Sequence, residues 1–205
     1  MRGLYVALEG ADRVGKSTQL QKLLKRLKAL ELQVVETQEP GATALGQELR
    51  RLLLREGTKS AMAELLLFLA DRAEHQHQVI EPALRKGQVV VSDRSAFSTV
   101  AYQGIGRGLG MDLVLHLHEE LGLMLPDLAI VLDMPEDEDR WEEREPDVVE
   151  SQGDHEELRR AYREIARRFP ERVQLVDAGG STRDVAVEIW QEVWPAVMTW
   201  REGRE

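Results

Sequence analysis

The stretch Gly10-Ala11-Asp12-Arg13-Val14-Gly15-Lys16-Ser17 decides the fold, because of what it contains and what flanks it. The run Leu4–Leu8 before it is apolar, as a buried strand requires, and from Ser17 to Leu30 apolar residues recur at helical spacing. The stretch fits G-x-x-x-x-G-K-[ST], in which the glycines let the backbone wrap around an anion and the N–H groups point at phosphates. The sequence therefore predicts a strand, a phosphate-binding loop and a helix in succession; the alternative is an ordinary glycine-rich turn.

The rest of the chain repeats this alternation of strand and helix. Four more apolar runs are expected strands: Gln33–Glu36, Val89–Ser92, Leu128–Leu132 and Val173–Val176. Longer stretches have helical periodicity: Leu45–Arg55, Met62–Leu84, Met111–Leu121, Glu156–Phe169 and about Arg183–Trp200. Such alternation predicts an α/β fold, with a mostly parallel five-stranded sheet covered by helices on both faces. Because ligands of such sheets bind at the carboxyl ends of the strands, the residues that follow each strand are the candidate site.

Composition limits the possible functions. The chain has 205 residues, which fits one domain, and 27 basic against 37 acidic residues give a net charge of −10. An acidic balance argues against a nucleic-acid or anionic-membrane partner bound through bulk charge. There is no Cys, which excludes disulfides and thiol nucleophiles, and no apolar run is long enough to cross a bilayer. The N-terminus begins with a strand-like run rather than a signal peptide, so we expect a cytoplasmic protein.

Side chains inside the glycine-bounded loop carry the chemistry. Lys16 would reach the β- and γ-phosphates of a nucleotide, and the Ser17 hydroxyl would ligate Mg²⁺. Arg13 is either a solvent-exposed turn residue or a built-in arginine finger that stabilises charge on a transferring phosphoryl group. Asp12 places a carboxylate beside a polyanion and therefore needs a cation or a hydroxyl nearby. We favour a substrate hydroxyl or an ordered water as its partner.

Charged residues also follow the later strands. Asp93 would hold Mg²⁺ or its water shell, or else it caps the next helix, and Arg94 would bind a second phosphate. For Asp133 we favour a structural role. Glu39-Pro40-Gly41 is a turn signal that permits a cis bond before Pro40.

One expected helix is too apolar for a surface helix. Leu65 to Ala70 is apolar on several sides, so one face should meet the sheet and another a partner chain or a ligand. Phe68 and Arg72 are four residues apart and therefore neighbours on one face. The ring would stack on a flat base and the guanidinium would bond its edge, although core packing is the simpler interpretation of Phe68 alone.

The region from Asp133 to Glu157 is crowded with acidic residues and is broken only by Arg140 and Arg144. A solvated acidic helix describes most of it. We expect a mobile lid at about 136–157 within a single domain spanning 1–205. A lid that closes over a nucleotide usually supplies cations. The shortage of Arg in this region agrees with an arginine finger located in the phosphate-binding loop, at Arg13.

These motifs together resemble the thymidylate kinase family, the nucleoside monophosphate kinases that phosphorylate dTMP. The resemblance rests on Glu9 to Thr18, Glu39-Pro40-Gly41 with Thr43, Leu66 to Ala73, Asp93-Arg94 leading to Ala101-Tyr102-Gln103-Gly104, Pro126-Asp127-Leu128 and Leu132-Asp133. Many ATPases share the phosphate-binding loop, whereas the Asp-Arg-Ala and Ala-Tyr-Gln-Gly segments in this order are more specific. The resemblance covers Leu4 to about Ala178. It implies a three-layer P-loop fold and a homodimer that packs helices together.

The resemblance implies an acceptor site for dTMP. Phe68 would stack on the thymine, and Arg72 and Gln103 would hold the edge of the base. Tyr102 would crowd the 2′ position of the sugar and favour deoxyribose. The charged contacts would be Asp12 to the 3′-hydroxyl, and Arg50 and Arg94 to the acceptor phosphate.

It also implies how ATP is held and used. The nucleotide-binding residues would be Gly10, Ala11, Asp12, Arg13, Val14, Gly15, Lys16, Ser17 and Thr18, with Arg140 against the adenine. The acceptor phosphate has a second pKa of about 6 and is already an anion, so no strong general base is needed. Lys16 and Arg13 would stabilise the moving phosphoryl group, and Asp93 would orient the metal shell, with Glu9 a weaker candidate.

Three positions depart from the pattern of the family: Gln38, where many bacterial members have Arg, Ala42, where a second Gly is usual, and Ser95, where an aromatic is usual. They cluster around the acceptor phosphate and its loop. Two alternatives therefore stay open, a kinase for another acceptor such as dUMP, a nucleoside or a small metabolite, and a nucleotide-dependent switch. A switch needs no base pocket, so Phe68 and Gln103 argue against it.

Overall fold

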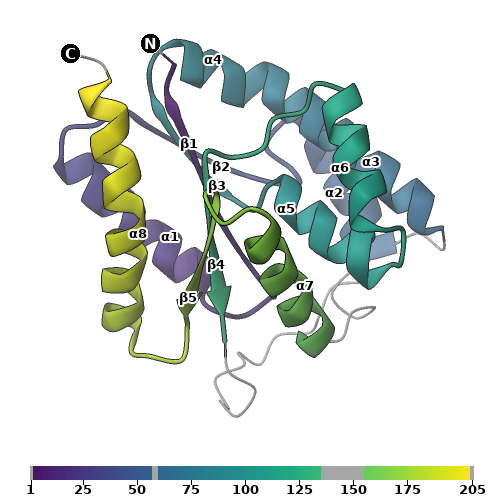
Figure 1. Cartoon of the computed structure of the whole chain (residues 1–205). Coiled ribbons are helices and arrows are strands. Elements are labelled where there is room, and N and C mark those ends of the chain that lie inside the picture. Colours follow the sequence, from purple (N-terminus) through teal and green to yellow (C-terminus); the bar gives the residue numbers. More distant parts are fainter. Residues whose placement is uncertain (1, 57–59, 135–154, 204–205) are drawn as a thin grey trace.

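A five-stranded parallel sheet forms the centre of the computed structural model of this chain (Figure 1). The structure describes residues 2–56, 60–134 and 155–203. The strands are β1 (Leu4–Gly10), β2 (Val34–Gln38), β3 (Val89–Asp93), β4 (Leu128–Asp133) and β5 (Val173–Asp177), in the spatial order β2-β3-β1-β4-β5. All neighbouring strands run parallel. The five predicted strands are confirmed, and each continues one or two residues beyond its predicted carboxyl end.

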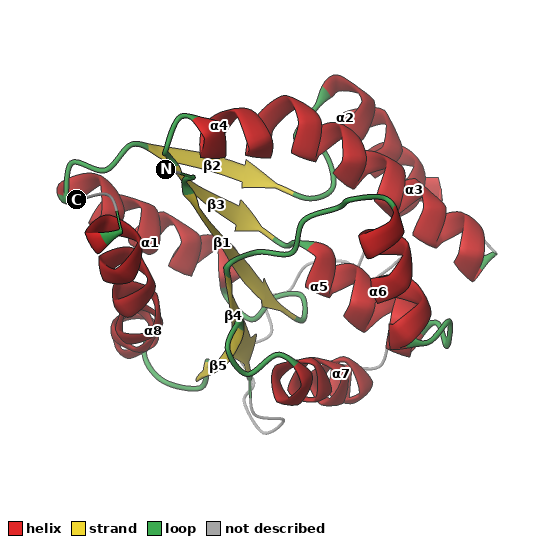
Figure 2. Ribbon diagram, turned by 45° about the horizontal axis from the view of Figure 1, so that its top comes forward, coloured by secondary structure: helices red, strands yellow, loops and turns green. Residues whose placement is uncertain are grey.

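Helices cover both faces of the sheet, which confirms the three layers (Figures 1 and 2). One face carries α1 (Lys16–Ala29) and α8 (Thr182–Glu202). The helices on the other side are α2 (Ala44–Arg51), α3 (Ala61–His75), α4 (Glu81–Arg85), α5 (Ala96–Thr99), α6 (Met111–Glu120) and α7 (His155–Arg168). Short π-helical segments extend three of these: η1 (Leu52–Glu56), η2 (Gln76–Ile80) and η3 (Val100–Gly106). Among the described residues, no helix has the length and apolar character needed to cross a membrane.

The alternation of side chains along β1 shows why the sheet needs a layer on each face. Leu4, Val6 and Leu8 belong to the core cluster beneath α1 and α8. Tyr5 and Ala7 belong to the clusters on the opposite face. All five are almost completely buried. Burial of each large apolar side chain contributes roughly 1.5–3 kcal/mol, so the two-sided pattern fixes the position of β1 in the middle of the sheet.

The structure differs from the predicted helices at α3 to α4 and at α5 to η3. The predicted helix Met62–Leu84 is a continuous helical run in which η2 separates α3 from α4. The helical run formed by α5 and η3 was not predicted, because Ala, Ser, Thr and Gly between 96 and 106 leave no apolar period. Its start is set by Ser95, whose hydroxyl accepts a hydrogen bond from Phe97 N.

The parallel register brings the carboxyl ends of β1 and β3 together. Leu8 lies opposite Asp93, so the phosphate-binding loop after β1 and the Asp93-Arg94 pair after β3 leave the sheet at the same edge. This edge is where the candidate site residues meet.

Candidate active site

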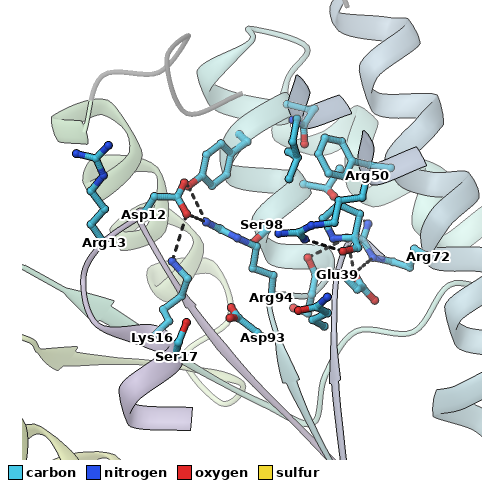
Figure 3. Close-up of a pocket in the computed structure, with 18 of the residues that line it drawn as sticks. Asp12, Arg13, Lys16, Ser17, Glu39, Arg50, Arg72, Asp93, Arg94 and Ser98 are labelled. Carbon is cyan, nitrogen blue, oxygen red and sulfur yellow. Dashed lines mark hydrogen bonds and ion pairs between the residues drawn. The ribbon is translucent and has the colours of Figure 1, made fainter. Parts of the chain in front are cut away.

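A cavity of about 280 Å³ opens at this edge of the sheet (Figure 3). Most of the predicted site residues line it: Asp12, Arg13, Gly15, Lys16, Ser17, Thr18, Arg50, Phe68, Arg72, Asp93, Arg94, Tyr102 and Gln103. Gly10, Ala11 and Val14 lie in the same loop without lining the cavity. Arg140 lies outside the described residues, and so does the predicted lid at 136–157, except for residues 155–157, with which α7 begins.

The phosphate-binding loop has the backbone shape that its sequence requires. Gly10 has a φ of +132°, and a Cβ on this residue would lie 2.7 Å from the carbonyl oxygen of Leu132, so only glycine fits there. Lys16 Nζ donates to the carbonyl oxygens of Gly10 at 3.1 Å and Ala11 at 2.6 Å. Burial and the neighbouring Arg94 lower the pKa of Lys16 to about 8. The lysine amine is therefore held against the backbone of the loop, and it loses its proton more readily than an ordinary lysine.

Asp12 joins the loop to β3 through charge. Its carboxylate pairs with the Arg94 guanidinium, accepts a hydrogen bond from the Tyr102 hydroxyl at 2.8 Å, and lies 3.6 Å from Lys16 Nζ. Burial disfavours the charged form of Asp12, but the two cations outweigh it and hold its pKa below the usual range. These contacts keep Asp12 ionised at the centre of the cavity.

Asp93 and Ser17 fit a divalent cation. Figure 3 shows both beside Lys16, at the end of the cavity nearest the loop. Asp93 Oδ1 is buried and has no hydrogen-bond partner among the described residues, which is unusual for a carboxylate oxygen. The described residues contain no cluster of three or more His, Asp or Glu side chains able to hold a metal. A cation here would take few protein ligands and keep positions for phosphate and water oxygens, as Mg²⁺ commonly does.

Glu9, the weaker metal candidate, does not line the cavity. Its buried carboxylate accepts hydrogen bonds from Ser95 Oγ at 2.6 Å, Ser98 Oγ at 2.5 Å and Tyr162 OH at 3.0 Å. Burial raises the pKa of Glu9 above its usual value. The structure gives this residue a role in joining β1, α5 and α7 rather than in holding a metal. The hydrogen bond from Ser95 to Glu9 also gives a reason for the departure from the family pattern at this position, because a larger aromatic residue could not replace Ser95 in it.

Arg72 has protein partners at each of its three nitrogen atoms, which the sequence did not reveal. Its Nε donates to Glu39 at 2.8 Å, one terminal nitrogen donates to Thr99 Oγ1 at 2.9 Å and lies 2.8 Å from His118 Nε2, and the other donates to the Ser95 carbonyl at 2.9 Å. Arg72 is 3% exposed, although it lines the cavity. The guanidinium is therefore held in one orientation within the cavity wall.

A second row of buried polar residues supports Arg72. Glu39 also contacts His75 Nδ1 at 2.9 Å, and His75 Nε2 lies 2.6 Å from Thr37 Oγ1. His118 Nδ1 contacts the Val114 carbonyl at 2.7 Å, so its other nitrogen is the acceptor that faces Arg72. Burial and the Arg72 charge lower the pKa of His118 to about 4, which keeps it neutral. Sequence reasoning missed both histidines. Each has another histidine two residues away in the chain, His77 and His116, and residues at that spacing do not share a helix face.

The cis peptide bond before Pro40 is present, and Glu39 and Pro40 of its loop line the cavity beside Arg50 of α2. Arg50 donates to the Pro40 carbonyl at 2.8 Å. Asp71 anchors the same loop by accepting from Gly41 N at 3.1 Å. Asp133, for which a structural role was favoured, pairs with Arg159 and Arg163 and thereby joins the end of β4 to α7.

Comparison with known proteins agrees with this geometry. The family model described as Thymidylate kinase matches residues 8–189. The chain is 42% identical over 198 residues to the thymidylate kinase of Synechococcus sp. (strain JA-3-3Ab), covering 95% of this chain and 97% of that one. It is 41% identical over 208 residues to that of Halothermothrix orenii, covering 94% and 97%. The crystal structure of thymidylate kinase from Ehrlichia chaffeensis superposes with a TM-score of 0.78 at 28% identity, covering 95% and 99%. The chain belongs to the thymidylate kinase family.

Proposed function

We propose that this chain transfers the γ-phosphoryl group of ATP to dTMP, which yields dTDP and ADP. One observation carries the proposal. The phosphate-binding loop and the residues suited to a flat base, Phe68 and Gln103, line the same cavity. A nucleotide phosphate at the loop and a nucleoside monophosphate at the other end would place donor and acceptor phosphates between Lys16 and Arg94 (Figure 3).

Charge neutralisation and positioning supply the catalysis. The acceptor phosphate is already an anion near neutral pH, so the chain has to gather cations around the transferring group rather than remove a proton. Lys16 would bind the β- and γ-phosphates, and Arg94 would exchange Asp12 for the acceptor phosphate. Arg13 stands apart from the Asp12 cluster, and one of its terminal nitrogens is buried without a hydrogen-bond partner among the described residues. That free donor suits the role of an arginine finger.

Ser17 and Asp93 are the residues that would hold Mg²⁺. The bound ion would neutralise charge on the phosphate oxygens of ATP. Asp93 Oδ1 would be available to the ion, because this oxygen is buried and lacks another partner in the described part of the chain. The Ser17 hydroxyl, in the first turn of α1, lies on the same side of the cavity.

An acceptor panel tests the proposed reaction. The purified chain would be supplied with ATP, Mg²⁺ and dTMP, dUMP, dCMP or thymidine, and both ADP release and the phosphorylated product would be measured. We expect dTDP as the main product. ATP hydrolysis without any phosphorylated acceptor would contradict a kinase and favour a nucleotide-dependent switch. A better rate with another acceptor would redirect the substrate assignment.

We also propose that the chain forms a homodimer and acts in the cytoplasm, where ATP and dTMP are soluble metabolites. We propose no nucleic-acid partner for it. Apolar side chains that are about half exposed lie on two helices: Met62 and Leu66 on α3, and Leu113 on α6 with Leu121 at its end. A second copy would cover such a surface. Sedimentation equilibrium should give twice the chain mass of 23.3 kDa, and Leu66→Glu should shift the mass toward the monomer.

A further inference from the structure

Gln103 is held in place by a buried carboxylate outside the cavity. Its amide nitrogen donates to Glu64 Oε1 at 2.9 Å, and Glu64 is 1% exposed. Gln103 comes from η3 and Glu64 from α3, so the bond joins two separate helices of the cavity wall. Glu64 does not line the cavity, whereas Gln103 does. The carboxylate therefore acts on the cavity through Gln103.

The chemistry of this pair fixes the orientation of the amide. An ionised carboxylate only accepts hydrogen bonds, so the atom that Gln103 turns toward Glu64 must be its nitrogen. The Arg107 guanidinium lies 3.6 Å from the other oxygen of Glu64 and supplies the counter-charge that a buried carboxylate needs. With the nitrogen turned toward Glu64, the carbonyl oxygen lies on the opposite side of the amide and is the acceptor that Gln103 can offer to the cavity. Without Glu64, the amide could turn over and present N–H groups instead.

We propose that Glu64 is the positioning residue that makes the acceptor site selective for a pyrimidine with an N–H group at ring position 3, and against one with a bare nitrogen there. This inference rests on the proposed function. A thymine or uracil ring offers an N–H to the carbonyl oxygen of Gln103. A cytosine ring offers a lone pair at the same place, and two facing acceptors repel each other while remaining unpaired. Glu64 thus sets base selectivity from behind the wall, without touching the substrate.

Glu64→Gln is the variant that tests the inference. A glutamine at this position can accept or donate, so the Gln103 amide would no longer be held in one orientation. We expect the ratio of kcat/KM for dTMP to kcat/KM for dCMP to fall by about tenfold or more, because a site built to pair one hydrogen-bonding edge strongly rejects the unpaired alternative. Glu64→Asp withdraws the carboxylate by one methylene and should lower the same ratio by a smaller factor, which keeps the test available if Glu64→Gln fails to fold.

The chain contains a matched control. Glu81 accepts from Gln76 Nε2 at 2.9 Å and from Arg85 at 3.0 Å, which repeats the Gln–Glu–Arg arrangement among residues that do not line the cavity. Glu81→Gln should leave the dTMP to dCMP ratio within about twofold of wild type. A second control combines Glu64→Gln with Gln103→Ala. Once the amide is absent, the change at Glu64 should no longer alter the ratio.

The outcomes separate this inference from the proposed function. A Glu64→Gln enzyme that loses activity equally toward dTMP and dCMP would show that Glu64 only supports the fold, and would overturn the inference. An equal change of the ratio in the Gln103→Ala background would also overturn it, because Glu64 would not act through the amide. If the wild-type chain phosphorylates neither nucleotide, the proposed function itself fails.

Discussion

Asp12 and Arg94 form an ion pair across the cavity, although 82 residues separate them in the sequence. The pair joins the phosphate-binding loop after β1 to the residue that follows β3, and Lys16 and Tyr102 contact the same carboxylate. The residue proposed for the acceptor phosphate and the residue proposed for the sugar hydroxyl are therefore partners of each other. Binding of dTMP would replace this contact with one contact from each residue to the substrate.

Asp12→Asn should weaken both stability and catalysis. Removal of the carboxylate leaves the partly buried Arg94 and the buried Lys16 without their shared counter-charge. Breaking such a pair costs about 3 kcal/mol of unfolding free energy. We also expect kcat/KM for dTMP to fall by about tenfold or more, because the 3′-hydroxyl loses its acceptor.

Denaturant unfolding and steady-state kinetics would measure both effects of Asp12→Asn. Asp112→Asn provides the control, because Asp112 pairs with Arg168 on the surface, where its side chain is 83% exposed. Exposed pairs contribute about 1 kcal/mol or less. Equal stability losses in the two variants would show that the Asp12–Arg94 contact does not behave as a buried pair.

Lys16 should take up a proton when Mg-ATP binds. Burial and Arg94 lower its pKa to about 8, so a large part of the amine is neutral at pH 8.5. Phosphate oxygens beside the amine favour the charged form, so binding at this pH should take up roughly half a proton or more. Calorimetric titrations in buffers of different ionisation enthalpy measure this uptake. Lys16→Arg, which stays charged, should bind without it; equal uptake by both proteins would assign the proton to another group.

The strands and the phosphate-binding loop could be predicted because their signals are local. Apolar runs mark the five strands, and Gly10, Gly15 and Lys16 lie at fixed spacing. The start of α8 is likewise local, because the Ser181 hydroxyl accepts a hydrogen bond from Asp184 N three residues on. These features depend on residues that are close together in the chain, so a single sequence reveals them.

The setting of Arg72 could not be predicted in the same way. Its partners Glu39, Thr99 and His118 are 33, 27 and 46 residues away, and only the folded chain brings them together. The sequence suggested a guanidinium free to read the base, whereas the structure holds each of its nitrogens with a protein partner. Glu64 behind Gln103 was hidden for the same reason, because an acidic residue near a helix start is ordinarily a surface residue.

His118 should make the protein less stable in mild acid. Its pKa of about 4 lies below the ordinary value of 6.5, because burial and Arg72 oppose its charge. The unfolded chain therefore binds more protons between these values, so the stability is present above pH 6.5 and is lost as the pH falls toward 4. The full shift corresponds to about 3 kcal/mol.

The variant that isolates His118 is His118→Gln, which offers Arg72 an acceptor that does not titrate. Asp71 changes the stability in the opposite direction over much of the same pH range. Burial and Glu39 raise its pKa to about 6, so its contribution to stability is lost as the pH rises. The informative quantity is thus the difference between wild type and variant in urea unfolding at pH 7.5 and pH 5. The variant should lose less stability than wild type over that range, and parallel losses would exclude His118 as the cause.

Arg13→Ala should lower kcat by about a hundredfold or more and change the KM for dTMP much less, because an arginine finger acts mainly on the charge of the transferring group. Arg13 has a φ of +69°, so the backbone directs this side chain from within the loop, and one terminal nitrogen has no partner among the described residues.

Arg51→Ala is the control, since Arg51 is an exposed residue that pairs with Glu48. Steady-state kinetics with both substrates varied would separate the two parameters. If kcat stayed unchanged while the KM for ATP rose, Arg13 would contribute to ground-state binding, and the positive charge on the transferring phosphoryl group would have to come from Lys16 and Arg94.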